Sequence, residues 1–186
     1  WNIDHESSDY GSIIDEISID DLSASAMASD ASFAVFGTET GFFGKVNLSN
    51  FELATVAYHH GAKLNVVALN PENLRAIVGA DNGVMLEYDL TELALLDNYV
   101  NSNNLASISS VAYSPDSSLA VAGDIDAGLT SWDLTAGSII RTYQGHDENV
   151  TAITFNDNGR SMFTSSWDNS IREWDIASGR IVQEFY

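Results

Sequence analysis

The chain repeats one spacing frame four times, and this repetition limits its fold more than any other feature of the sequence. Apolar residues mark the frame at intervals of 42, 44 and 42 residues: Met27, Leu69, Tyr113 and Phe155. Nineteen residues after each mark comes a second pair, Val46-Asn47, Tyr88-Asp89, Trp132-Asp133 or Trp174-Asp175. A recurring period of this length indicates an array of small units, each of which buries its apolar surface against the next.

The stretch 145–175 shows what one unit contains. It opens with Gly145-His146 and closes with Trp174-Asp175. Between them lie three short runs, 150–155, 162–166 and 170–174, and the first is rich in the β-branched and aromatic residues typical of strands. Polar turn residues that tolerate positive φ separate the runs. The pattern predicts a three-stranded antiparallel meander, followed by an outer strand at 180–186.

A unit with a Gly-His entrance, three strands and a Trp-Asp exit resembles one repeat of the WD-repeat β-propeller family, whose repeats are about 40–45 residues long. The resemblance is closest over 101–186, weaker over 59–100 and weakest over 23–58. It implies an all-β fold made of four-stranded antiparallel blades. About four blades are present, so the expected architecture is a partial or half propeller within a larger ring.

The frame also predicts the domain boundaries. Residues 1–22 are expected to hold the end of a preceding repeat, marked by Trp1-Asn2, and an outer strand at 13–19. Four blades would then follow at 23–58, 59–100, 101–144 and 145–186. Because an open arc leaves two apolar blade faces exposed, we expect further blades from a longer chain, a complementary propeller half or a second copy.

The composition excludes several classes of partner. Twenty-seven acidic residues stand against 7 basic ones, giving a net charge of −20 over 186 residues. Nucleic acids and anionic membranes would be repelled, since binding them needs a basic surface. No apolar run reaches membrane-spanning length, the first residues lack a signal-peptide pattern, and cysteine is absent. We expect a soluble protein and favour the cytoplasm, with an extracellular location left open.

In the WD-repeat family a histidine, a strand hydroxyl, a turn aspartate and the tryptophan form a hydrogen-bonded structural tetrad. The resemblance places it at His146, Thr164 (or Ser166), Asp168 and Trp174. Such a set is physically sound, because a histidine bridges two partners through its ring nitrogens and a buried carboxylate must be paired. Partial tetrads are expected at His60 and Asp81 in the second blade, and at Asp126 and Trp132 in the third, where Asn104 takes the place of the histidine.

Catalytic and metal-binding interpretations of the same residues are less favoured. A Ser-His-Asp triad uses similar residue types, but the tryptophan and the repeat frame already account for all four positions. The four histidines show no metal-ligand spacing, and Asp124–Gly128 lacks the glutamate that would complete a calcium loop. No catalytic residue, metal or cofactor is predicted.

The resemblance also implies a partner-binding surface. Function in this family lies on the rim and on the end face near the turn between the second and third strands. The residue before the turn aspartate is expected there: Trp167 in the fourth repeat, Ile125 in the third and Ala80 in the second. An exposed Trp167 would anchor a protein or peptide; packing of Trp167 on a neighbouring blade is the open alternative. Asp147 and Glu148 add negative charge, which favours a basic or mixed-charge partner.

One departure from the family pattern concerns the residue before the tryptophan position, which is usually aliphatic. Here it is Lys45, Glu87, Ser131 or Glu173. Each polar side chain is expected either to reach solvent or to pair with a neighbour, which would make the contacts between blades wetter.

The predicted function is that of a non-enzymatic scaffold for protein–protein interaction. One alternative is a structural subunit of a larger, extracellular assembly. Another is an enzyme that uses the propeller channel, although the sequence offers no nucleophile–base pair to support it.

Overall fold

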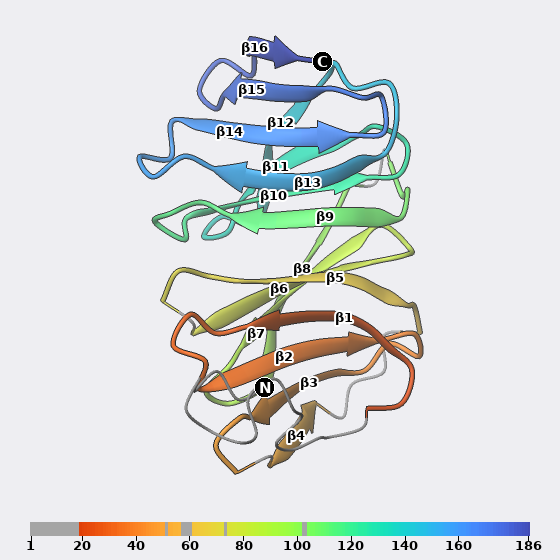
Figure 1. Ribbon diagram of the computed structural model, residues 1–186, viewed down its shortest axis with the longest axis vertical. Coiled ribbons are helices and arrows are strands. Elements are labelled where there is room, and N and C mark those ends of the chain that lie inside the picture. Colours follow the sequence, from red (N-terminus) through yellow and green to blue (C-terminus); the bar gives the residue numbers. More distant parts are fainter. Residues whose placement is uncertain (1–18, 51, 57–60, 73, 102–103) are drawn as a thin grey trace, which may run out of the picture.

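The computed structural model describes residues 19–50, 52–56, 61–72, 74–101 and 104–186. These residues form sixteen β-strands in four sheets, as shown in Figure 1. None of the described segments is a helix, and therefore none is a helix suited to crossing a membrane. The Trp1-Asn2 exit and residues 13–18 of the expected strand lie outside the described residues, and Ile19 is not part of a strand.

Each sheet is a blade of four strands in chain order. Blade one contains β1 (Leu22–Met27), β2 (Phe33–Thr38), β3 (Phe43–Asn47) and β4 (Leu53–Val56). Blade two contains β5 (Leu64–Leu69), β6 (Arg75–Ala80), β7 (Val84–Asp89) and β8 (Ala94–Val100). Blade three contains β9 (Ile108–Tyr113), β10 (Leu119–Asp124), β11 (Leu129–Asp133) and β12 (Ser138–Tyr143). Blade four contains β13 (Val150–Phe155), β14 (Ser161–Ser166), β15 (Ile171–Asp175) and β16 (Ile181–Phe185).

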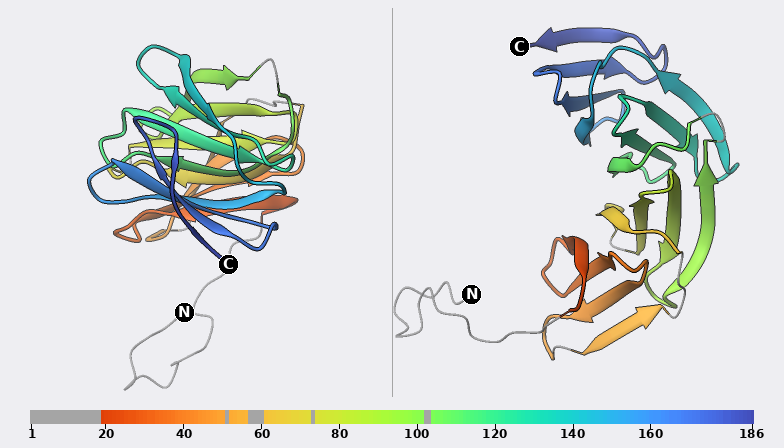
Figure 2. Two further views of the ribbon diagram at one scale, coloured as in Figure 1. Left: turned by 90° about the horizontal axis from the view of Figure 1, so that it is seen from above. Right: turned by 90° about the vertical axis from the view of Figure 1, so that its right-hand side faces the viewer.

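All neighbouring strands within a blade pair antiparallel. Figure 2 shows the four blades side by side in an open arc, with β1, β5, β9 and β13 along its inner side. The frame marks fall at equivalent places: the four inner strands end at Met27, Leu69, Tyr113 and Phe155, and the third strands end at Asn47, Asp89, Asp133 and Asp175. The prediction of an all-β fold with about four antiparallel, four-stranded blades is confirmed.

The core lies between the blades. The residue at the tryptophan position faces the preceding blade: Tyr88 stacks on Phe43 of blade one at a ring separation of 4.2 Å, and Trp174 contacts Tyr143 of blade three edge-on at 5.7 Å. Three apolar clusters result, one at each interface between neighbouring blades. Each blade is therefore stabilised by its neighbours, as expected for stacked repeats.

A repeated polar contact also joins the inner strands. Ser23, at the bulge of β1, donates from Oγ to the carbonyl of Leu64 in the next blade. Asn65 donates from Nδ2 to Ile108 O at 3.1 Å, and Ser109 donates from Oγ to Val150 O at 2.7 Å. A β-bulge leaves one residue outside the regular ladder, and here the freed side chain bonds the following blade.

The aspartate that ends the third strand has a local role. Asp89 Oδ1 accepts the N–H groups of Thr91 and Glu92, at 2.7 and 2.9 Å. Asp175 Oδ1 likewise accepts the Ser178 N–H at 2.7 Å. For Asp89 these backbone hydrogen bonds hold the pKa of the carboxyl below its ordinary value. The carboxylate thus closes the turn that leads into the outer strand.

Three glycines let the inner strands approach the preceding blade closely. A Cβ on Gly37, Gly79 or Gly123 would lie 2.7, 2.3 or 2.6 Å from a side-chain atom of Leu64, Ile108 or Val150, respectively. In blade four the same frame position is Ser165. We expect Gly79→Ala to lower the free energy of unfolding by about 1–3 kcal/mol, because the added methyl group overpacks the contact with Ile108. Urea denaturation measures the change.

Ser165→Ala is the matched control, since no described blade follows that position. It should cost less than about 1 kcal/mol, the scale of one exposed hydrogen bond. Equal losses for Gly79→Ala and Ser165→Ala would contradict the role assigned to the glycine.

Candidate functional site

Blade four contains a complete hydrogen-bonded chain from a buried indole to a carboxylate. Trp174 Nε1 donates to Thr164 Oγ1 at 2.8 Å, and Thr164 Oγ1 lies 2.7 Å from His146 Nε2. His146 Nδ1 lies 2.7 Å from Asp168 Oδ2. Because a carboxylate only accepts, His146 Nδ1 carries the proton donated to Asp168, and in the neutral imidazole Nε2 is then the acceptor of the threonine hydrogen. Ser166 lies outside this chain and donates to Glu148 O at 2.9 Å.

Asp168 is the most heavily bonded group of this site. Its Oδ1 accepts from the Ser170 N–H at 2.9 Å and from the Ser170 hydroxyl at 2.6 Å, while its Oδ2 accepts the Asp147 N–H at 3.2 Å. Burial opposes ionisation, but hydrogen bonds from Ser170, His146 and the backbone outweigh it and hold the pKa of Asp168 far below its ordinary value. Asp168 is therefore an anion at neutral pH that fixes the loop before β13.

A buried cation extends this network and was not among the residues predicted from the sequence. Arg172, on β15, places Nη1 at 3.4 Å from Asp168 Oδ2, and its Nε pairs with Glu184 on β16. The pairing of the third and outer strands is the feature that could have indicated this ion pair, because it places Arg172 directly opposite Glu184. Such pairs stabilise a sheet, and here the pair links the tetrad to the outer strand.

Blade three has a different arrangement at the equivalent place. Asn104 Nδ2 donates to Asp124 Oδ2 at 2.7 Å, whereas the predicted Asp126 contributes its N–H to Asp124 Oδ1 at 2.8 Å. Trp132 is buried, but Ala122 stands where blade four has Thr164, so the hydroxyl of the tetrad is missing. A void of about 20 Å³, enough for one water molecule, is lined by Asn104, Asp124, Trp132 and their neighbours. Asp126 and Trp132 therefore do not form a partial tetrad.

In blade two, His60 lies outside the described residues, so its expected pairing with Asp81 is not described. Asp81 itself is exposed, and its N–H donates to Lys63 O at 2.9 Å.

In all four blades the turn between the second and third strands lies on the same side of the arc, along the right-hand edge of Figure 1. Each is tied to the loop that enters the same blade by one backbone hydrogen bond. The donor and acceptor residues are Glu39 and Asp21, Asp81 and Lys63, Ile125 and Ser107, and Trp167 and Asn149, at 2.8–3.0 Å. We call the surface formed by these turns and entry loops the end face.

The end face carries exposed apolar side chains on blades three and four. The Trp167 side chain is 68% exposed and Ile125 is 49% exposed, and Leu105 also lies open to solvent. Ala80, expected at this surface, is buried instead. Asp81, not Ala80, occupies the position in blade two that Ile125 and Trp167 occupy in blades three and four. The predicted surface residue of blade two was therefore wrong by one position.

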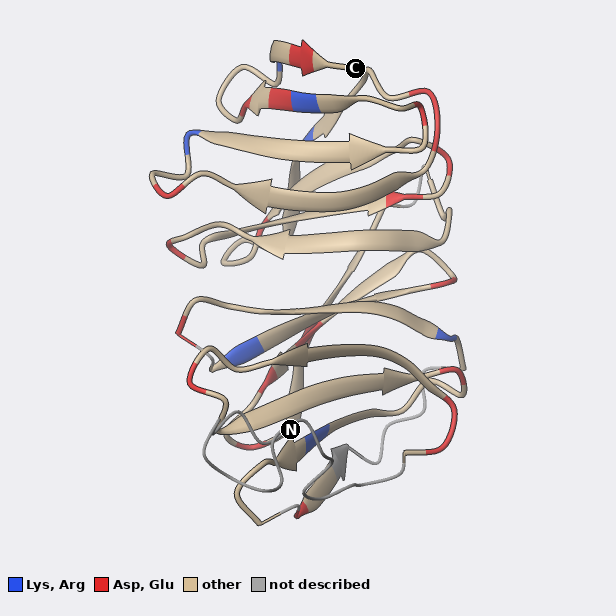
Figure 3. Cartoon of the chain, viewed as in Figure 1, with Lys and Arg blue, Asp and Glu red and all other residues tan. Residues whose placement is uncertain are grey.

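Acidic residues flank these apolar residues, and Figure 3 shows Asp and Glu positions in red along the same edge. Asp147 and Glu148 are exposed on the entry loop beside Trp167, and Asp126 is exposed next to Ile125. On blade one, Glu39 is paired with Lys63 at 2.7 Å. The end face thus combines exposed apolar groups with a negative border.

Comparison with known proteins agrees with the geometry of the blades. The family model described as "WD domain, G-beta repeat" matches residues 99–133 and 137–175. Transducin-like enhancer protein 2 from Mus musculus is 27% identical over 116 residues, which cover 62% of this chain and 15% of that protein. The chain therefore corresponds to a small part of the length of this relative.

The hydrogen-bonded chain gives a stability prediction. Thr164→Val preserves shape but leaves the Trp174 N–H and His146 Nε2 buried without a partner, so it should cost about 1–3 kcal/mol for each group. Ser166→Ala removes two hydrogen bonds, to Glu148 O and from the Asp168 N–H, neither of them fully buried, and should cost about 0.5–1.5 kcal/mol for each. Urea denaturation compares the two, and a larger loss for Ser166→Ala would show that the wrong hydroxyl has been assigned.

Asp168 also gives a pH prediction. Its pKa is lower in the folded than in the unfolded protein, where carboxyls titrate near about 3.9. Its contribution is therefore complete above that value and is lost as the pH falls below it. Asp168→Asn should be less stable than the wild type at pH 7, and the difference should shrink towards pH 2. Thermal denaturation across this range measures it; a difference that is constant with pH would contradict the assignment.

Proposed function

The chain carries WD repeats and folds into WD-repeat propeller blades, and from this premise we propose that it is a non-enzymatic scaffold whose end face binds a protein or peptide through Trp167. WD repeats support a protein-interaction scaffold in general terms. The exposed indole is the observation that supports this surface in particular.

Trp167 has the properties of a binding anchor. Its backbone is held by the N–H bond to Asn149 O at 3.0 Å, and the flanking Ser166 is bonded to Ser170 and Glu148. A large aromatic side chain on a fixed turn loses little conformational entropy when a partner covers it. Because this much aromatic surface in water is unfavourable in isolation, the arrangement favours a partner that buries it.

The border of the anchor favours a particular partner charge. Asp147 and Glu148 adjoin Trp167, and the whole chain carries a net charge of −20. A basic or mixed-charge partner would be attracted and oriented by this field, whereas an acidic one would be repelled. Apolar contact with the indole would then supply most of the affinity.

The state of His146 supports a structural over a catalytic role for the tetrad. Both ring nitrogens are occupied, by Asp168 and by Thr164, and the Thr164 oxygen also accepts from Trp174. The histidine is 7% exposed. A general base must reach a substrate proton, and this imidazole is enclosed by the blade that it supports.

Trp167→Ala tests the proposal. Partners are captured from an extract of the source organism by the immobilised wild-type chain, and their affinities for purified variants are then measured by calorimetry. Trp167→Ala should weaken binding at least about tenfold, as for a hot-spot residue, while changing the free energy of unfolding by less than about 0.5 kcal/mol.

Val182→Ala is the matched control, because Val182 is an exposed apolar residue on β16, away from the end face. Its binding should equal that of the wild type. Unchanged binding by Trp167→Ala, or equal loss in both variants, would disprove the proposed anchor.

A further inference from the structure

The face of blade four that looks away from blade three has no partner among the described residues, although the equivalent faces of blades one to three are covered. In blades one to three, the face that looks towards the following blade buries the pairs Val35 and Phe43, Ile77 and Met85, and Val121 and Leu129. Their counterparts in blade four are Phe163, half-buried, and Ile171, 47% exposed. Phe185 is 44% exposed, whereas its counterparts Tyr99 and Tyr143 are buried. A hollow of about 250 Å³ lies over this surface, between Ala152, Phe163, Ser165 and Ile171.

We propose that this open face of blade four binds a further blade-like β-sheet that places an arginine or lysine side chain against Glu173. The surface lies on the side of the last blade and does not include Trp167, so this proposal is independent of the end face.

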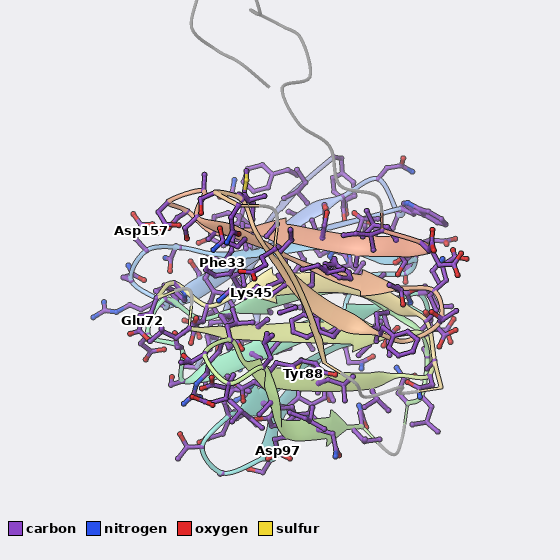
Figure 4. The ribbon with its side chains drawn as sticks, turned by 90° about the horizontal axis from the view of Figure 1, so that it is seen from below. Phe33, Lys45, Glu72, Tyr88, Asp97 and Asp157 are labelled. Atoms are coloured by element: carbon purple, nitrogen blue, oxygen red, sulfur yellow. The ribbon has the colours of Figure 1, made fainter. Side chains whose placement is uncertain are left out.

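The position of Glu173 is used for contact with the next blade elsewhere in the chain. In blade one, Lys45 Nζ donates to Leu90 O of blade two at 3.1 Å and lies 4.3 Å from the centre of the Phe33 ring. Figure 4 shows Lys45 and Phe33 close together. In blade two, Glu87 is 2% exposed and accepts the Tyr113 hydroxyl of blade three at 3.2 Å. Burial and the adjacent Glu87 carboxylate raise the pKa of Tyr113, so this phenol remains a donor.

Glu173 differs from Glu87 in the hydrogen-bond donors and cations that its own blade places near the carboxylate. Glu87 also accepts the Tyr99 hydroxyl at 2.9 Å and pairs with Arg75 at 3.4 Å, both within blade two. At the equivalent places blade four has Phe185 and Ser161, and within the described parts of the chain the Glu173 carboxylate has no donor. A sheet that covered Glu173 would bury an unpaired charge unless it brought a cation itself.

The cation would come from the last residue of the incoming inner strand. Tyr113 holds that place in blade three, at the end of β9, and it is the residue that reaches back to Glu87. An arginine or lysine there would neutralise Glu173, which a tyrosine alone would not do.

The inner strand of blade four has a side chain that could hydrogen-bond a further inner strand. Thr151 occupies the frame position of Ser23, Asn65 and Ser109, the residues that bond a carbonyl of the next blade. Its hydroxyl instead lies 2.9 Å from Ser165 Oγ, within its own blade. An incoming inner strand would offer Thr151 the carbonyl that the other three side chains already have.

A second copy of the chain fits this face poorly. Its blade one would present Met27 to Glu173, and a thioether donates no hydrogen bond. It would present Leu22 to Ser165, at the position where the preceding blades have glycine because an added Cβ would come within 2.3–2.7 Å of the next side chain. The partner sheet therefore begins its inner strand with a residue smaller than leucine.

A chain extended by its own fourth blade tests the proposal. Residues 145–186 are repeated after Tyr186, with Val150→Ala in the added copy to make room for Ser165. Two forms are compared: one retains Phe155 in the copy, and the other carries Phe155→Arg there. The arginine form should unfold with an equilibrium constant about tenfold smaller, a typical coupling for a close pair. Glu173→Gln in the original blade should abolish the difference.

Amide hydrogen exchange in the 150–155 segment of the copy, which Val150→Ala distinguishes in mass from the original segment, verifies that the added blade is folded in each form. Equal stability of the arginine and phenylalanine forms, or an advantage of arginine that survives Glu173→Gln, would overturn the proposal.

Sedimentation of the unextended chain provides a second measurement that does not depend on the added blade. It should be monomeric at micromolar concentration. A dimer that Ile171→Asp dissociates would assign the open face to a second copy and would also overturn the proposal.

Discussion

The burial of one blade face against the next is the interaction on which the whole structure depends. A four-stranded sheet of this chain has apolar side chains on both faces, so a single blade has no interior of its own. The close approach of Leu64, Ile108 and Val150 to Gly37, Gly79 and Gly123 brings the inner strands together. The bulge side chains then find a carbonyl across the same gap. The polar contacts between blades are therefore a consequence of tight apolar packing, and they fix its register.

Polar groups buried in this packing are satisfied in two ways. Blade four uses a local chain, in which Trp174, Thr164, His146 and Asp168 bond one another within a single blade. Blade two uses a contact between blades, in which Glu87 accepts hydroxyls from its own blade and from blade three. Incomplete networks of this kind are costly, because each broken link leaves a buried group unpaired. The buried carboxylate of blade four is thus satisfied within its own blade, whereas that of blade two also depends on blade three.

The repeat frame predicted the strands because strand and turn positions depend on residues close together in the sequence, and the spacing of apolar and turn residues shows them directly. The ends of the inner strands at Tyr113 and Phe155, and the ends of the third strands at Asp133 and Asp175, follow directly from it. Contacts between distant residues were not accessible in the same way. Nothing near Glu87 in the sequence indicates Tyr113, and the sequence likewise did not indicate that Asn104 donates to Asp124, at the end of β10, instead of to Asp126. Ala80 is the buried last residue of β6, whereas Asp81 begins the exposed turn, so an error of one residue placed the expected surface position inside the blade.

The use of its cations explains why the chain presents an acidic surface to partners. Five of the 7 basic residues form a hydrogen bond or an ion pair with another group of the chain. They are Lys45, Lys63, Arg75, Arg141 and Arg172. Arg141, for example, donates to the Ala177 carbonyl of the next blade at 2.9 Å. Most of the acidic side chains in the described residues, in contrast, are exposed. A partner that binds the end face or the open blade face therefore contacts carboxylates that the basic residues of this chain do not neutralise. Such a partner must supply positive charge itself.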